Sequence, residues 1–245
     1  MITKFCKNCV NSSNRPGLTF NVDDICDACQ NSVAKNKIDW KSREEELVKL
    51  LDQHRSKNGD HDVLVPTSGG KDSTYVAHQL KYVYGMNPLG VSWAPAMYTE
   101  VGYKNLKLFA DNYDTLVYVT NRETHRKLTR ISFEEFGDPF QPFHYGQQSF
   151  PVKIAMKYKI PLIIYGENQN VEYGSSKAKK ESPFEDMNER YYQQSLRVEA
   201  GVDTLIKIGV KNKIFNKKNM KNINFHDYRL PLKKETKKEK IKIFF

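Results

Sequence analysis

The sequence has no cysteine after Cys29, although the chain is 245 residues long. Covalent catalysis by a thiolate and cysteine ligation of a cluster are therefore excluded from most of the chain. No run approaches about 18 consecutive apolar residues, and the N-terminus lacks the apolar region of a signal peptide. We therefore expect a soluble, cytoplasmic protein that makes no contact with a membrane.

Residues 1–206 lack a net charge, because the formal charge of +10 arises entirely from the C-terminal segment. From Lys207 to Phe245 there are twelve lysines and one arginine against three acidic residues. A nucleic-acid enzyme usually carries its basic surface on the folded domain. We therefore do not expect nucleic acid to be a partner. The lysine tract from Lys233 to Lys242 has few apolar residues, so we expect it to be disordered. We expect residues 207–245 as a whole to form a basic tail that is truncated or disordered.

All four cysteines lie in two Cys-x-x-Cys pairs, with sixteen residues between the pairs. Two such turns can surround one metal ion with four soft ligands, which is typical of a structural zinc site. Two disulfides are disfavoured by a cytosolic setting, and a redox pair is disfavoured by the duplication of the motif. The pattern therefore predicts a zinc-ribbon module over residues 1–38, with a linking helix within residues 39–60. The expected ligands are Cys6, Cys9, Cys26 and Cys29.

A glycine-containing hexapeptide follows the apolar run Asp62–Pro66 and precedes a segment with helical periodicity, Thr74–Tyr84. Glycines in such a strand-to-helix turn allow a close approach of the backbone, and the start of the helix favours an anion. The motif is not a Walker A loop, which has a different glycine spacing and a Ser or Thr after its lysine. We expect the six residues to bind the phosphates of ATP: Ser68, Gly69, Gly70, Lys71, Asp72 and Ser73.

Alternating strand and helix patterns continue after this motif and predict an α/β fold with a doubly wound parallel sheet. We expect this domain to span residues 61–206. The predicted strands are Pro88–Trp93, Thr115–Thr120 and Pro161–Tyr165, and the predicted helices are Trp40–Arg55, Glu100–Asn112, Arg122–Phe136 and Ile154–Lys157, with an aromatic loop at Phe140–Gly146.

A second polar segment directly follows the strand at Pro161–Tyr165. Ligands of doubly wound sheets bind beyond the carboxyl ends of the strands, so we expect this segment to line the same site. The polar stretch 175–192 is either a solvated surface or a lid over the second substrate. The expected substrate-binding residues are Gly166, Glu167, Asn168 and Glu172.

The hexapeptide resembles the PP-loop of the ATP pyrophosphatases, which adenylate an oxygen atom and release pyrophosphate. Together with the cysteine pairs and Gly166–Gly174, it makes the chain similar, from Cys6 to about Tyr192, to N-acetyl sugar amidotransferases. These enzymes act in the biosynthesis of bacterial surface polysaccharides such as the O-antigen of lipopolysaccharide, and of flagellin sugars.

The resemblance implies an enzyme that converts a sugar acetamido group into an acetamidino group. Its substrate would be a nucleotide sugar or a nonulosonic acid, and its cofactors would be ATP, Mg²⁺ and a structural Zn²⁺. Lys71 and Asp72 would be catalytic, with Asp72 on the magnesium side. A glutaminase with an ammonia channel, resembling the subunits of imidazole-glycerol-phosphate synthase, would supply ammonia.

Two other functions stay open. PP-loop enzymes that thiolate tRNA resemble the chain too, but many carry sulfur on cysteines of the catalytic domain. A non-enzymatic zinc-ribbon RNA-binding protein would leave the ATP loop unexplained. The amidotransferase family also extends beyond this length, and the lysine- and phenylalanine-rich end resembles the product of a frame change. We therefore expect the native C-terminus to be missing.

Overall fold

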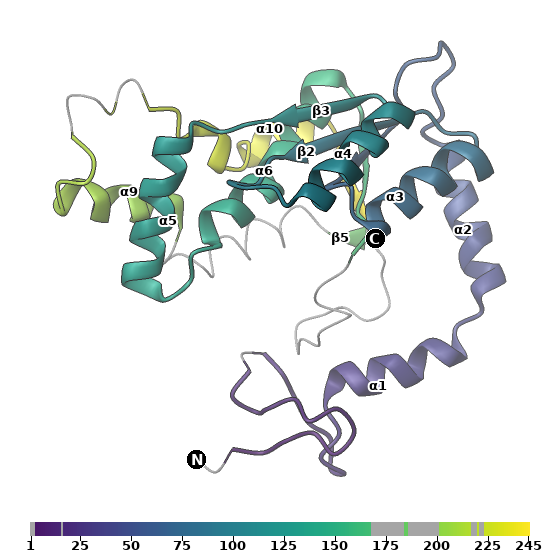
Figure 1. The fold of residues 1–245 in the computed structure, drawn as a ribbon. Helices are drawn as coiled ribbons and strands as arrows, with labels where there is room; N and C mark the ends of the chain where they lie inside the picture. The colour runs from purple at the N-terminus through teal and green to yellow at the C-terminus, as the bar shows by residue number, and fades with distance from the viewer. Residues whose placement is uncertain (1–2, 16, 168–183, 186–200, 217–219, 221–222) are drawn as a thin grey trace. The chain divides into compact units, whose positions relative to one another are not determined.

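The chain divides into two compact units in the structure, which is a computed structural model. The first unit holds the described residues up to Gln53, with Glu167 and Phe245, and the second holds those from His54 to Gly166 and from Phe184 to Phe244. None of the described helices is long and apolar enough to span a membrane. The structure describes residues 3–15, 17–167, 184–185, 201–216, 220 and 223–245 (Figure 1).

The first unit begins with irregular chain around the four cysteines and continues into helices. Isolated bridges join Phe5 to Ser12 and Phe20 to Cys26. The side chain of Asp39 caps α2 by accepting a hydrogen bond from the Ser42 amide. The small core consists mostly of the cysteines themselves, so a bound metal would supply stability that apolar packing cannot. The helices are α1 (Asp27–Ala34), η1 (Lys35–Lys37) and α2 (Trp40–Asp52).

The second unit is built on one sheet with the strand order β3-β2-β1-β4-β6-β5. Five strands are parallel, and the two-residue strand β5 is antiparallel to β6 at one edge. Leu64 of β1 is paired with Leu89 of β2 on one side and Ile163 of β4 on the other. The strands are β1 (Val63–Pro66), β2 (Pro88–Trp93), β3 (Thr115–Tyr118), β4 (Leu162–Ile164), β5 (Phe184–Glu185) and β6 (Lys242–Phe244).

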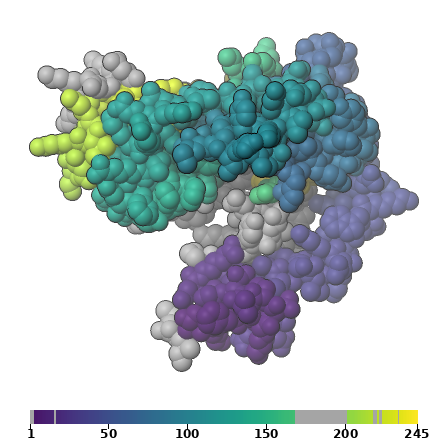
Figure 2. All heavy atoms as spheres, in the orientation of Figure 1, coloured from purple at the N-terminus to yellow at the C-terminus, as the bar shows by residue number. Residues whose placement is uncertain are grey.

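Helices follow most of the strands, as the alternating sequence pattern predicts. The helix after β1 changes from α to π geometry near its end. A left-handed Gly137 ends α5. Helix α9 lies beside α5 (Figures 1 and 2), with Gly209 close to Ile131. The helices are α3 (Lys71–His78), η2 (Gln79–Val83), α4 (Glu100–Asn112), α5 (Arg122–Phe136), α6 (Gln141–Tyr158), α9 (Val202–Lys211), η5 (His226–Tyr228) and α10 (Lys233–Lys238).

Both faces of the sheet are covered, which explains the apolar strands. A Cβ atom added to Gly90 would lie 2.5 Å from the Phe109 ring of α4. Trp93, three residues along the same strand, lies against Gly146 of α6 instead. Successive side chains of a strand point to opposite faces, so α4 and α6 cover opposite faces of the sheet. The predicted α/β class and parallel sheet are therefore confirmed.

The aromatic segment Phe140–Gly146 forms the N-cap and the first turns of helix α6, so the prediction of a loop is wrong. Pro142 is compatible with this helix because it lies in the first turn, where a backbone N–H has no carbonyl partner within the helix. Gly146 allows the helix to lie directly on the Trp93 indole, since a Cβ atom there would lie 1.9 Å from the ring.

The tail is ordered where the structure describes it, so the prediction of a disordered tail is wrong for those residues. Ile241 and Ile243 are buried, and β6 is hydrogen-bonded along β4. Apolar residues alternate with lysines here, which is the pattern of a strand with one buried face. The high lysine content of the whole tail had concealed this local alternation of apolar residues and lysines.

The η5 segment attaches the tail to the sheet at the ends of β2 and β3. The Tyr118 hydroxyl donates a hydrogen bond to the Asp227 carboxylate, and the Tyr228 ring packs edge-on against Trp93 at 5.3 Å. Lys153 of α6 donates to the His226 carbonyl. Burial is the main cause that lowers the Lys153 pKa to about 8. These contacts make the tail an integral part of the second unit.

Candidate functional site

The phosphate-loop sequence lies where β1 ends and α3 begins. Helix α3 starts at Lys71, and its N-cap residue Gly70 has an extended backbone and, as a glycine, no side chain that could cap the helix. The start of a helix carries a partial positive charge from its peptide dipoles. The loop therefore offers the electrostatic environment that a phosphate group requires.

Gly69 is required by its backbone conformation and by its surroundings. Its φ angle is +77°, in the left-handed region that favours glycine. A Cβ atom at this position would lie 2.5 Å from the backbone nitrogen of Leu106 in α4. The loop thus packs directly on the backbone of the neighbouring helix, and no other residue fits without displacing one of them.

Gly166 lies beside the phosphate loop, although almost one hundred residues separate them in the sequence. A Cβ atom on Gly166 would lie 2.8 Å from the Asp72 carbonyl carbon and 2.8 Å from the Ser73 nitrogen. The strand order explains this contact, because β4 is next to β1 on the side opposite β2. The order of strands reverses between β1 and β4, and ligands of open α/β sheets bind at such a point.

The other predicted substrate residues are only partly described. Glu167 directly follows Gly166 and is exposed. Asn168 and Glu172 lie outside the described residues, as does nearly all of the stretch 175–192. Gly166 itself has a packing role in this structure, because its contacts are with the backbone of α3.

Lys71 and Asp72 form an ion pair at the start of α3, with 2.5 Å between Nζ and Oδ1. The Lys71 side chain is 87% exposed, and that of Asp72 is 37% exposed. An ion pair this exposed adds little to stability. The lysine can therefore turn toward an arriving anion at small cost, and the carboxylate could then hold a metal ion.

The two serines of the hexapeptide differ in their surroundings. Ser68 is exposed, whereas the Ser73 hydroxyl lies 2.9 Å from Thr67 Oγ1. Thr67 is buried and also accepts a hydrogen bond from the Gly69 amide at 3.0 Å. Sequence reasoning missed Thr67, although a hydroxyl residue two positions before a loop glycine is a known signal for this local hydrogen bond.

The four cysteines form a candidate metal centre in the first unit. Their sulfur atoms all lie within 4.8 Å of one another. Cys6 Sγ is 4.0 Å from Cys29 Sγ, and Cys9 Sγ is 3.5 Å from Cys26 Sγ. A tetrahedral zinc–thiolate site, with bonds of about 2.3 Å, requires sulfur atoms about 3.8 Å apart. The cluster therefore fits a metal ion of this kind.

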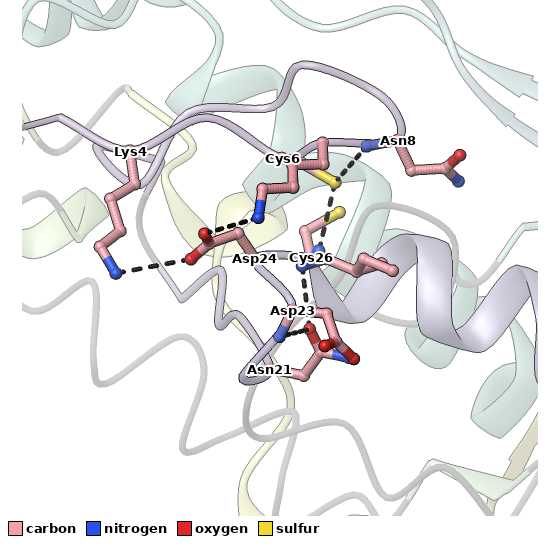
Figure 3. Close-up of polar contacts among 9 residues, drawn as sticks. Lys4, Cys6, Asn8, Asn21, Asp23, Asp24 and Cys26 are labelled. Carbon is pink, nitrogen blue, oxygen red and sulfur yellow. Dashed lines mark hydrogen bonds and ion pairs between the residues drawn. The ribbon is translucent and has the colours of Figure 1, made fainter.

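Backbone amides around Cys6 favour its thiolate form (Figure 3). The Cys26 amide donates to Cys6 Sγ at 3.2 Å, and the Asn8 amide donates to it at 3.4 Å. These bonds, the one from Cys26 first, lower the Cys6 pKa to about 6. Thiolates are the form that binds metals, so these bonds favour ligation by Cys6.

Searches of protein-family models and of curated proteins found no significant match to this chain.

Proposed function

We propose that the chain is an ATP-dependent sugar amidotransferase of the PP-loop ATP pyrophosphatase type. It converts an acetamido group into an acetamidino group by adenylating the amide oxygen and then admitting ammonia. The observation that supports this most directly is the position of Ser68–Ser73 at the reversal of strand order, with Gly166 packed on the same helix start. A glycine-containing loop at this point supports the proposal, because nucleotides bind at such a point in open α/β sheets.

The loop residues can supply the positive charge that the proposed reaction requires. An amide oxygen is a poor leaving group, so it first attacks the α-phosphorus of ATP and displaces pyrophosphate. Lys71 and the helix dipole of α3 stabilise the charge that develops on the departing pyrophosphate. Asp72 would hold a Mg²⁺ ion, which supplies further positive charge when bound. Ammonia then adds to the activated carbon, and AMP leaves with the original oxygen.

The nature of the nucleotide product tests this proposal. We expect AMP and pyrophosphate as products, because the loop lacks the Walker arrangement that acts on the γ-phosphate. The measurement is chromatography of the spent nucleotide after incubation with Mg²⁺, ammonium and a panel of N-acetylated nucleotide sugars and nonulosonic acids. ADP as the sole product would refute the assignment.

The same assay separates the amidotransferase from its main rival. A parallel reaction contains unmodified tRNA and a sulfide donor in place of the sugars and ammonium. Consumption of ATP that depends on tRNA, with none that depends on a sugar, would favour a thiolating enzyme. Ammonia would come from a glutaminase partner, so glutamine alone should not replace ammonium with the isolated chain.

We also propose that the metal at the four cysteines is a structural zinc ion. All four thiolates are ligands, which leaves no open coordination position for catalysis. The first unit has only a small core, so the metal would contribute much of its stability.

Metal analysis tests the zinc proposal. We expect one zinc ion per chain in protein purified without chelator, and Cys9→Ser should lower the metal content and destabilise the first unit. Lys7→Ser, an exposed change within the same turn, is the matched control and should keep the metal. Protein that contains no zinc, or a Cys9→Ser variant with unchanged metal content, would contradict the proposal.

A further inference from the structure

Thr67 connects the two ends of the phosphate loop by hydrogen bonds of its side chain. The residue is 8% exposed, and its own amide donates to the Val91 carbonyl of β2 at 2.9 Å, which ties it to the sheet. Its hydroxyl accepts from the Gly69 amide and pairs with the Ser73 hydroxyl in the first turn of α3. One buried side chain therefore links the end of β1, the turn and the helix.

The Ser73 hydroxyl is turned into this arrangement and not toward the exposed side of the loop. It lies 2.9 Å from Thr67 Oγ1 and 3.3 Å from the Gly70 carbonyl oxygen. Its contacts fix the distance between the strand end and the helix start. On its other side, the loop rests on the α4 backbone at Gly69. The loop is thus restrained by its own hydrogen bonds and by its contact with α4.

We infer that Thr67 is a positioning residue that holds the loop in its phosphate-binding shape through the Thr67–Ser73 hydroxyl pair. This inference rests on the proposed function, because it assigns ATP as the ligand of the loop. Without the Thr67 hydroxyl, the Gly69 amide loses a buried acceptor and must find another partner. The peptide planes of the turn then rotate, and the donors that face the phosphates lose their alignment.

The experiment compares Thr67→Val, which keeps the shape but removes the hydroxyl, with Thr67→Ser, which keeps the hydroxyl. We expect Thr67→Val to weaken the binding of ATP with Mg²⁺, measured by calorimetry, by about tenfold, the equivalent of one or two hydrogen bonds. Hydrogen exchange of the Gly69 amide in the protein without nucleotide should also become about tenfold faster. Thr67→Ser should restore both values to within about twofold of the original protein.

Thr115→Val is the matched control, because it removes a different threonine hydroxyl, one that is partly buried and donates to the Tyr113 carbonyl at 2.7 Å. It lies at the start of β3, whereas the loop lies at the end of β1. We expect this control to lower stability without changing ATP affinity or Gly69 exchange. A Thr67→Val protein with unchanged exchange and affinity would overturn the inference.

Two further outcomes separate the inference from the proposed function. If Ser73→Ala weakens ATP binding far more than Thr67→Val does, Ser73 acts on the ligand itself, and the positioning role of the hydroxyl pair is overturned. If the original protein binds no ATP, the proposed function fails, and the positioning role fails with it. Faster Gly69 exchange in Thr67→Val would then show that the hydroxyl pair stabilises the loop without serving a nucleotide.

Discussion

Deleting residues 241–245 is expected to prevent the second unit from folding. Strand β6 completes the parallel sheet, and Ile243 in it is fully buried. The Lys242 amide donates to the Pro161 carbonyl at 2.7 Å, and the Tyr165 amide donates to the Phe244 carbonyl at 2.9 Å. The deletion removes these bonds and leaves the edge of β4 without its partner strand. We expect aggregated protein, or soluble protein without a cooperative unfolding transition by circular dichroism.

A single substitution in the same strand is milder than the deletion, so the stability of the folded variant can be measured. Ile243→Ala should lower the free energy of unfolding by about 2–5 kcal/mol, the usual cost of removing a buried aliphatic side chain. Lys237→Gln, an exposed change in the neighbouring helix α10, is the control and should change it by less than about 0.5 kcal/mol. A deleted chain that unfolds with the same midpoint as the original would show that β6 does not belong to the sheet in solution.

Replacing Lys71 by alanine is expected to slow pyrophosphate release by about 100-fold to 1,000-fold. The lysine is highly exposed at the start of α3, so the fold should not depend on it. Without the positive charge of Lys71, the negative charge that develops on the departing pyrophosphate is less stabilised. The measurement is the initial rate of pyrophosphate release with saturating ATP and an N-acetylated sugar substrate, with thermal unfolding of the same preparation.

Lys127→Ala is the matched control for Lys71→Ala. Lys127 also forms a short ion pair on a helix, with Glu123 at 2.6 Å, but it lies on α5. We expect this variant to react at the original rate. Asp72→Ala should behave like Lys71→Ala, because the carboxylate is assigned to Mg²⁺. Near-normal turnover in either loop variant would show that the hexapeptide does not take part in the reaction.

Much of the second unit could be predicted from the sequence because its elements carry strong local signals. The predicted bounds of β2, α4 and α5 agree with the structure. Thr99 and Asn121 cap the two helices with their side chains, and Gly137 ends α5 in the left-handed conformation. Such caps and turns depend on neighbouring residues, so a single sequence reveals them.

The errors arose where distant residues decide the structure. The aromatic half of α6 is helical because Gly146 allows close packing on Trp93, a contact that local periodicity does not reveal. The alternation around Ile241 and Ile243 is short, and its meaning depends on β4 as a partner. The prediction relied on the high lysine content of the tail and not on this alternation, so a strand of the sheet was predicted to be disordered.

The position of the hexapeptide between a strand and a helix could be predicted from the sequence, but its internal contacts could not. The glycines and the lysine of the loop are recognisable by type and spacing. That Gly166 contacts the start of α3 follows from the strand order, which one sequence does not specify. Thr67 was missed because it lies just before the hexapeptide, and its hydroxyl acts on the backbone of the turn.

The burial of Trp93 gives the protein a built-in optical probe. The chain has two tryptophans, and Trp40 belongs to the first unit with 61% of its surface exposed. Trp93 is 5% exposed in the second unit, among the rings of Tyr118, Phe150 and Tyr228. Their fluorescence should therefore differ, with a blue-shifted emission from Trp93 and a water-like emission from Trp40. In a Trp40→Phe background, the remaining tryptophan emission follows the second unit alone, so unfolding of the sheet can be observed without a contribution from the first unit.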